Sequence, residues 1–195
     1  MNKYEITKGS IADIMNKENV SLAESFLSCD CIILFDVSGS MENKDGTGTS
    51  RFDRGIKELK DLQALLPGKV AIVQFADKVD FMPGGVPIMY ISGLGTNMTA
   101  ALKYIKIADD IPGMRFIIIS DGEPNNALTA LAEAAQFQNP LDTIFIGPED
   151  DQWHDNGRSF LTQLASRSGG QPVQSAAENI KEEVQLLLSE RSVIS

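Results

Sequence analysis

The 195-residue sequence is poor in the residues that build thiolate or imidazole metal sites, because it has only two cysteines and one histidine. Cys29 and Cys31 stand two apart in what reads as a strand, where both side chains would lie on one face in a poor geometry for a disulfide. With no cluster of further Cys or His residues, core packing is favoured over a metal role. Two free thiols in an apolar run are typical of a reducing compartment, so we expect a cytoplasmic protein.

Basic charge is also scarce: 17 Lys and Arg residues face 27 Asp and Glu residues, for a net charge of -10. Without a basic stripe the chain has little with which to neutralise a phosphate backbone or an anionic lipid surface, so we expect no nucleic-acid partner. No apolar run approaches the ~20 residues of a membrane span. Charges such as Asp13 and Lys17 in the first periodic stretch exclude a secretory signal, and we expect no membrane association.

The sequence does contain an alternation of strand and helix patterns. Four short apolar runs are continuous, which is typical of strands buried on both faces of a parallel sheet. They cover residues 31–35, 70–75, 116–119 and 143–146. Residues 79–82 follow the second run after only two residues, which predicts a short antiparallel edge strand.

Helical periodicity fills the stretches between these runs. The first such stretch, residues 10–27, carries two capping signals and is predicted to form two short helices broken near Asn19. The last is predicted to open at Ser175, which stands three residues before Glu178. We therefore predict an N-terminal helical extension (1–27) and one α/β domain (28–195). The domain is expected to be doubly wound and Rossmann-like, with about six mostly parallel strands, one antiparallel edge strand, and helices on both faces.

Oxygen-bearing side chains gather where these predicted elements meet. Asp36, Ser38 and Ser40 directly follow the first core strand, and Asp121 follows the strand at 116–119. Thr96 lies in the loop before a predicted helix. Open α/β sheets place their sites at the carboxyl ends of strands, and Mg²⁺ prefers oxygen ligands. The sequence therefore predicts a divalent-metal site at this edge.

These residues resemble the metal-ion-dependent adhesion site of von Willebrand factor A domains, in which an Asp-x-Ser-x-Ser element precedes a Thr and then an Asp. Asp36, Ser38 and Ser40 match the first element, Thr96 in Gly-Leu-Gly-Thr-Asn matches the second, and Asp121 in Ile-Ser-Asp-Gly-Glu-Pro matches the last. The resemblance runs from residue 29 to residue 188. The loop at 42–50 is somewhat long and acidic for the family, but this departure touches no proposed ligand.

The resemblance implies a function. In the family the serine hydroxyls bind the metal, the Thr and Asp positions bind it directly or through water, and the sixth position takes a carboxylate from a partner protein. For this chain it implies Mg²⁺, with Mn²⁺ or Ca²⁺ as alternatives, and a partner that presents an Asp or Glu side chain. Free-standing relatives often work with ATPases or larger complexes, which implies a partner of that kind. We expect an interaction module rather than an enzyme.

Other interpretations remain open. A hydrolase could be metal-dependent or use Ser38, Asp121 and His154 in the chain order of an α/β-hydrolase triad, although Ser38 lacks the Gly-x-Ser-x-Gly turn. A phosphoryl-transfer enzyme would usually carry a second Asp where Ser38 stands. The chain could also be a metal-independent scaffold of an ATPase-linked complex. Finally, Asp36 and the serines could merely cap a helix and shape a turn, which leaves Thr96 and Asp121 as coincidences.

Overall fold

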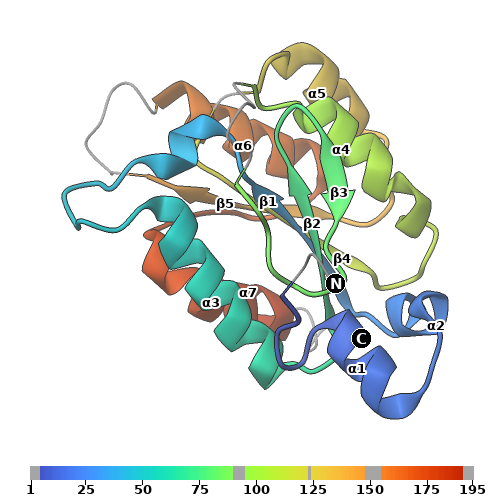
Figure 1. Cartoon of the computed structure of the whole chain (residues 1–195). Coiled ribbons are helices and arrows are strands. Elements are labelled where there is room, and N and C mark those ends of the chain that lie inside the picture. The colour runs from blue at the N-terminus through green and yellow to red at the C-terminus, as the bar shows by residue number, and fades with distance from the viewer. Residues whose placement is uncertain (1–4, 90–94, 123, 148–154, 191–195) are drawn as a thin grey trace.

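The computed structural model describes residues 5–89, 95–122, 124–147 and 155–190. A six-stranded sheet in the order β3-β2-β1-β4-β5-β6 runs through its middle (Figure 1). Every pairing is parallel except that of β3 with β2, so the predicted doubly wound sheet with one antiparallel edge strand is confirmed. The strands are β1 (Cys31–Asp36), β2 (Val70–Phe75), β3 (Val79–Phe81), β4 (Arg115–Ser120), β5 (Leu141–Ile146) and β6 (Pro172–Ser175).

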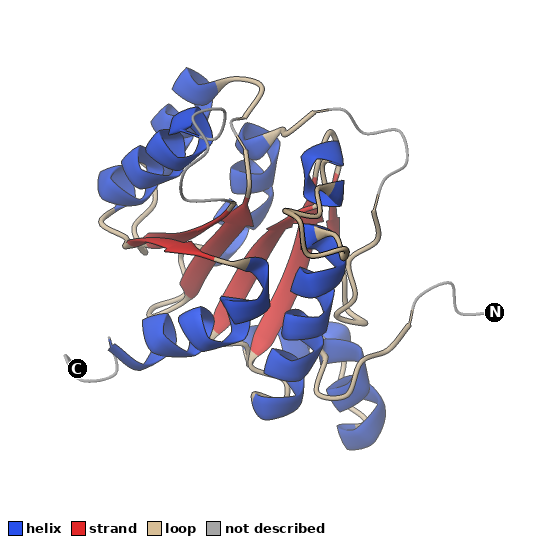
Figure 2. Ribbon diagram, turned by 90° about the vertical axis from the view of Figure 1, so that its left-hand side faces the viewer, coloured by secondary structure: helices blue, strands red, loops and turns tan. Residues whose placement is uncertain are grey.

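Helices cover both faces of this sheet (Figure 2). On one face lie α3 (Arg51–Leu65) and α7 (Ile180–Glu190), and on the other lie α4 (Met98–Ile105), α5 (Ala127–Ala134) and α6 (Asp155–Ser168). Short 3-10 turns join some of these elements. They are η1 (Gly39–Glu42), η2 (Lys106–Ala108) and η4 (Ala177–Asn179).

The central strand β1 shows why the sheet needs two helical layers. All six of its residues are buried. Ile32 and Leu34 pack with the core under α4, α5 and α6, whereas Ile33 and Phe35 pack with the core under α3 and α7. Side chains alternate between the faces of a strand, so a continuous apolar run leaves apolar side chains on both faces. The predicted helices on both faces follow from this pattern.

The two cysteines lie on opposite faces of the sheet, contrary to the prediction of a shared face. Cys29 packs in the core under α4 to α6, whereas Cys31 packs in the core under α3 and α7. The prediction of a shared face was wrong because β1 begins only at Cys31, so Cys29 lies in the turn before it. Both thiols are free and buried, and burial raises the pKa of Cys29 to about 12. A thiol of this kind is a packing residue and a poor nucleophile.

The last helix begins later than predicted. Ser175 does not cap it but closes β6, where it lies opposite Ile146 of β5. The chain then enters η4 at Ala177 before α7 begins at Ile180. The strand β6 is short, opens with a proline and has little apolar character, so strand pairing at the sheet edge had no signal in the local pattern.

Two helices precede the sheet, α1 (Ile11–Glu18) and α2 (Leu22–Leu27). The predicted break is confirmed: Asn19 ends α1 in the left-handed conformation with φ 54°. Ile11 is buried in the main core, and the amide of Ala12 donates to the carbonyl oxygen of Pro83. The Phe26 ring meets Phe81 of β3 edge-on, with ring centroids 5.6 Å apart. In the described residues, no helix has the length and apolar character to cross a membrane.

Candidate metal centre

The predicted ligands lie around the carboxyl ends of β1 and β4, which are parallel neighbours at the centre of the sheet. After β1 the chain enters α3 on one face, and after β4 it enters α5 on the other. The connections therefore diverge at these two strands. In open α/β sheets this switch point is where ligands bind.

Asp36 is the last residue of β1, and its side chain is fully buried. Its Oδ1 accepts a hydrogen bond of 2.8 Å from the amide of Ser38, and its Oδ2 accepts one of 2.5 Å from the hydroxyl of Ser120. These bonds hold the carboxylate between the ends of two strands. Ser38 has an extended backbone conformation and directly precedes the 3-10 turn η1.

The two serines connect this loop to β4. The Oγ atoms of Ser38 and Ser40 lie 3.1 Å apart, and the Ser40 hydroxyl donates to Oδ1 of Asp121 at 2.7 Å. Asp121 is buried, whereas Ser40 is exposed to solvent. Four of the five predicted ligands (Asp36, Ser38, Ser40 and Asp121) thus form one chain of contacts across 85 positions of sequence that opens to solvent at Ser40.

Thr96, the fifth predicted ligand, is held next to the loop that follows β4. Its amide donates to Oδ1 of Asn125 at 2.9 Å, and the amide of Asn125 donates back to the Thr96 carbonyl oxygen. A Cβ at Gly95 would stand 2.2 Å from Oδ1 of Asp77, so a larger residue before Thr96 would require the Asp77 and Asn125 side chains to move. Within the described residues, the hydrogen bonds of Thr96 go to Asn125 and not to the other four predicted ligands.

Arg51, the first residue of α3, was missed by sequence reasoning. Its side chain is only 1% exposed, and its Nη1 donates to Oδ2 of Asp121 at 2.6 Å. Its Nε and Nη2 donate to the two carboxylate oxygens of Asp45 at 2.7 and 2.5 Å. The one available signal was its place at a helix start, where the helix dipole disfavours a cation. A residue in that place needs anionic partners.

Burial and the neighbouring Asp121 carboxylate raise the pKa of Asp36 to about 7. Two carboxylates in one buried site repel each other, and a cation bound between them would relieve this repulsion. The described residues contain no group of three or more Cys, His, Asp and Glu side chains that could hold a metal ion. A metal at this site would therefore need the hydroxyl oxygens of Ser38 and Ser40 beside the two carboxylates. Such an all-oxygen set suits Mg²⁺ or Mn²⁺.

The alternative triad cannot be placed as a whole, because His154 lies outside the described residues. Its other two members, Ser38 and Asp121, both contact Ser40. Among the described residues, Ser38 has no contact with a basic side chain.

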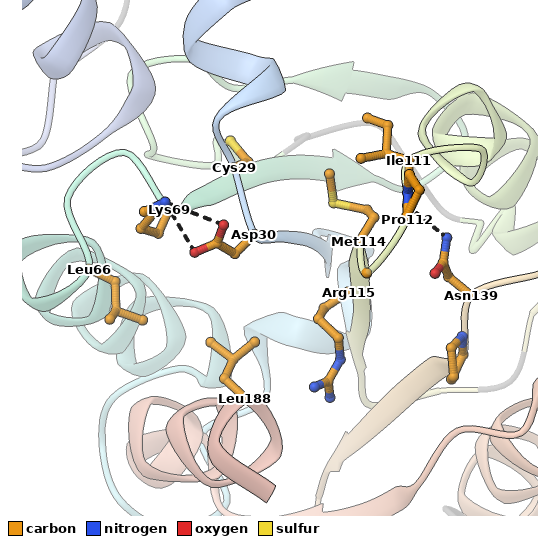
Figure 3. A pocket seen from close by; sticks show the side chains of 12 residues that line it. Cys29, Asp30, Leu66, Lys69, Ile111, Pro112, Met114, Arg115, Asn139 and Leu188 are labelled. Carbon is orange, nitrogen blue, oxygen red and sulfur yellow. Dashed lines mark hydrogen bonds and ion pairs between the residues drawn. The ribbon is translucent and has the colours of Figure 1, made fainter. Parts of the chain in front are cut away.

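A cavity of about 560 Å³ lies at the opposite edge of the sheet, around the amino ends of β1 and β4 (Figure 3). Both cationic side chains in its lining have anionic partners: Lys69 pairs with Asp30 at 3.3 Å, and Arg115 pairs with Asp142 at 2.6 Å. The cavity contains none of the predicted ligands.

No protein-family model and no curated protein matches this sequence. Several solved structures do match its fold. The conserved hypothetical protein BatB from Bacteroides thetaiotaomicron has a TM-score of 0.59 at 20% identity, covering 83% of this chain and 98% of that one. An aerotolerance-related membrane protein from Bacteroides fragilis has a TM-score of 0.57 at 16% identity, covering 82% and 98%.

The manganese-loaded TRAP protein from Plasmodium vivax is a more distant match. Its TM-score is 0.51 at 15% identity, and the alignment covers 83% of this chain and 74% of that one. At these identities the likeness concerns the fold alone. The comparison and the sheet order together show that this chain has a von Willebrand factor A-like fold.

Proposed function

We propose that this chain is a metal-dependent protein-interaction module. A divalent ion, Mg²⁺ by preference, would be held by Asp36, Ser38, Ser40, Thr96 and Asp121, and it would bind a carboxylate of an Asp or Glu on a partner protein. The observation that carries the proposal is the contact chain from Asp36 through the two serines to Asp121. It places hydroxyl and carboxylate oxygens together at the switch point of the sheet.

The spacing of these oxygens supports an octahedral ion. Ligands at ~2.0–2.1 Å from Mg²⁺ in adjacent octahedral positions stand roughly 3 Å apart. The Oγ atoms of Ser38 and Ser40 are 3.1 Å apart, and Oγ of Ser40 is 2.7 Å from Oδ1 of Asp121. These hydroxyls need only turn their protons away to offer lone pairs to an ion.

The ligand types support recognition of a carboxylate. Three of the five proposed ligands are neutral hydroxyls, and the Asp121 carboxylate already pairs with Arg51, so the ion keeps part of its charge and favours an anionic group at an open coordination position. Mg²⁺ keeps several waters in protein sites, so a partner side chain can enter by replacing one of them. A partner within an ATPase or another multi-protein complex is part of this proposal by analogy with free-standing domains of this fold.

Isothermal titration of the metal-free protein with Mg²⁺ and Mn²⁺ tests the metal step. We expect saturable binding that Ser38→Ala and Asp121→Ala abolish. Thr99→Ala is a matched control, because Thr99 stands three residues after Thr96 and its hydroxyl contacts Thr129 instead of the site. If the folded wild type takes up neither ion, or if Ser38→Ala and Asp121→Ala bind as it does, the proposal is wrong.

A further inference from the structure

Arg51 brings a positive charge into contact with a predicted metal ligand. Its guanidinium is only 1% exposed and holds Oδ2 of Asp121, while Oδ1 of that carboxylate accepts from Ser40. Burying an arginine beside a site for a cation is costly, because the ion and the guanidinium repel each other. A site selected for metal affinity alone would avoid this arrangement.

The charges around the site show what the arginine changes. Asp36, Asp121 and Arg51 together carry one net negative charge when both carboxylates are ionised. A divalent ion then leaves the loaded centre with one positive charge, whereas without Arg51 the ion and the two carboxylates would cancel. A neutral centre has little attraction for an incoming anion, but a positive centre in a buried setting attracts a carboxylate strongly.

The carboxylate of Asp45 offsets part of the positive charge of Arg51. It accepts from Nε and Nη2 of Arg51, its side chain is 19% exposed, and it is shared with Arg54, which bonds it at 3.0 Å. Water screens the more exposed Asp45, so it offsets the guanidinium only in part.

We propose that Arg51 determines the preference of the loaded site for an acidic partner: it lowers metal affinity and raises affinity for a carboxylate on the bound ion. This inference rests on the proposed function and adds a residue outside the predicted ligand set. A merely structural role would be to fasten the loop at 42–50 to α3 through Asp45. The two roles differ in what the loss of Arg51 does to the two affinities.

Arg51→Gln, with Arg54→Gln as matched control, separates these roles. Both variants remove one positive charge from α3 and one partner of Asp45, but Arg54 bonds Asp45 and Glu178 and has no contact with Asp121. Titration calorimetry would give the Mg²⁺ and Mn²⁺ affinities. Acetate binding to the Mn²⁺-loaded protein would be followed by water-proton relaxation, which falls as a carboxylate replaces a bound water.

For Arg51→Gln we expect metal binding at least about tenfold tighter and acetate binding at least about threefold weaker than in the wild type. We expect Arg54→Gln to stay close to the wild type in both. The opposite signs are decisive, because a distorted site would lose both affinities together. Changes of the same sign in Arg51→Gln, or equal changes in the two variants, would overturn the inference.

Asp45→Asn provides a second test that keeps the Arg51 side chain but replaces one of its two carboxylate partners with a neutral amide. Asp45 lies in a loop with φ 46°, a conformation that asparagine adopts readily, so the variant should fold. Loss of its charge should act in the reverse direction, with weaker metal binding and tighter acetate binding. If Arg51→Gln does not fold, an unchanged Asp45→Asn overturns the inference. A wild type that binds no metal overturns the proposed function as well, whereas one that binds metal and acetate leaves the variants to decide.

Discussion

The strand β4 has an ion pair with a buried carboxylate near each end, and the two pairs differ in their surroundings. At the amino end, Arg115 donates to Oδ2 of Asp142 at 2.6 Å; just beyond the carboxyl end, Asp121 accepts from Arg51 at the same distance. Each arginine reaches a carboxylate that is distant in sequence. Geometry alone therefore does not distinguish the two pairs.

Their surroundings do distinguish them. At the amino end, Arg115 also donates to the carbonyl oxygen of Leu187, and Oδ1 of Asp142 accepts from the amide of Gln171. At the carboxyl end stands a second buried carboxylate, Asp36, whose partners among the described residues are hydrogen-bond donors rather than a cation. Removing one partner of a buried ion pair destabilises the fold, whereas a second buried carboxylate without a cation creates a place for an ion.

The largest expected effect on stability concerns the ion pair at the amino end of β4. Arg115→Met removes the guanidinium that bonds Oδ2 of the fully buried Asp142, and breaking a buried pair in this way costs about 3–5 kcal/mol of stability. Urea denaturation of wild type and variant would measure it. Mg²⁺ affinity should not change, since Arg115 lies at the far end of the strand. A loss below about 1 kcal/mol, or a large change in metal affinity, would contradict the division between the two ends.

A pH titration of protein stability tests the second buried carboxylate, Asp36, near the carboxyl end of β4. The pKa of Asp36 is raised in the folded chain to about 7 from an ordinary value of 3.8. Between these two pH values the folded state binds more protons than the unfolded state. The stability of the metal-free protein should therefore fall as pH rises from about 4 to about 7, with a slope of up to about 1.4 kcal/mol per pH unit.

Denaturant midpoints at several pH values, compared with Asp36→Asn, would isolate this contribution. Asp13, Asp45 and Asp109 have lowered pKa values, so their contributions are lost only at more acidic pH and do not overlap this window. Saturating Mg²⁺ should reduce the dependence of stability on pH, because the ion takes the place of the proton on Asp36. An identical slope in Asp36→Asn would refute the assignment.

Bound Mg²⁺ should stabilise the folded protein through the site at the carboxyl ends of β1 and β4. At a free Mg²⁺ concentration 100 times the dissociation constant, binding to the folded state alone contributes about 2.7 kcal/mol. Thermal or urea unfolding with Mg²⁺ and then with EDTA would show the gain and its loss. Arg115→Met should keep this increment and Ser38→Ala should lose it. Equal increments in Ser38→Ala and the wild type would place the ion elsewhere.

The smallest expected effect lies away from both ends of β4. Ser21 and Glu24 form a reciprocal cap at the start of α2. Ser21→Ala should cost about 1 kcal/mol, the usual value for a helix cap, and leave the affinity for Mg²⁺ unchanged. Urea denaturation midpoints would measure the loss of stability, and calorimetry would measure the affinity for Mg²⁺. A changed metal affinity would mean that the N-terminal helices influence the site.

Local pattern predicted most of the architecture. The buried strands are continuous apolar runs, and the helix ends carry caps such as Ser10 and Ser50, whose hydroxyls accept from amides three residues on. The local sequence pattern did not predict β6 or the start of α7. There, pairing with β5 outweighed a capping signal at Ser175 that would serve equally well in isolation.

The sequence was enough to predict which oxygen-bearing side chains stand at the ends of β1 and β4. Asp36 and Asp121 follow apolar runs that are typical of buried parallel strands, and parallel strands end at the same edge of a sheet, so the two carboxylates were expected on one edge; the pairing of β1 with β4 brings them near each other. Tertiary structure alone decided that Arg51 joins them from α3, 70 positions from Asp121. An arginine at a helix start can turn to solvent or inward. Which it does depends on the carboxylates that folding brings within reach, because a buried guanidinium is stable only against such partners.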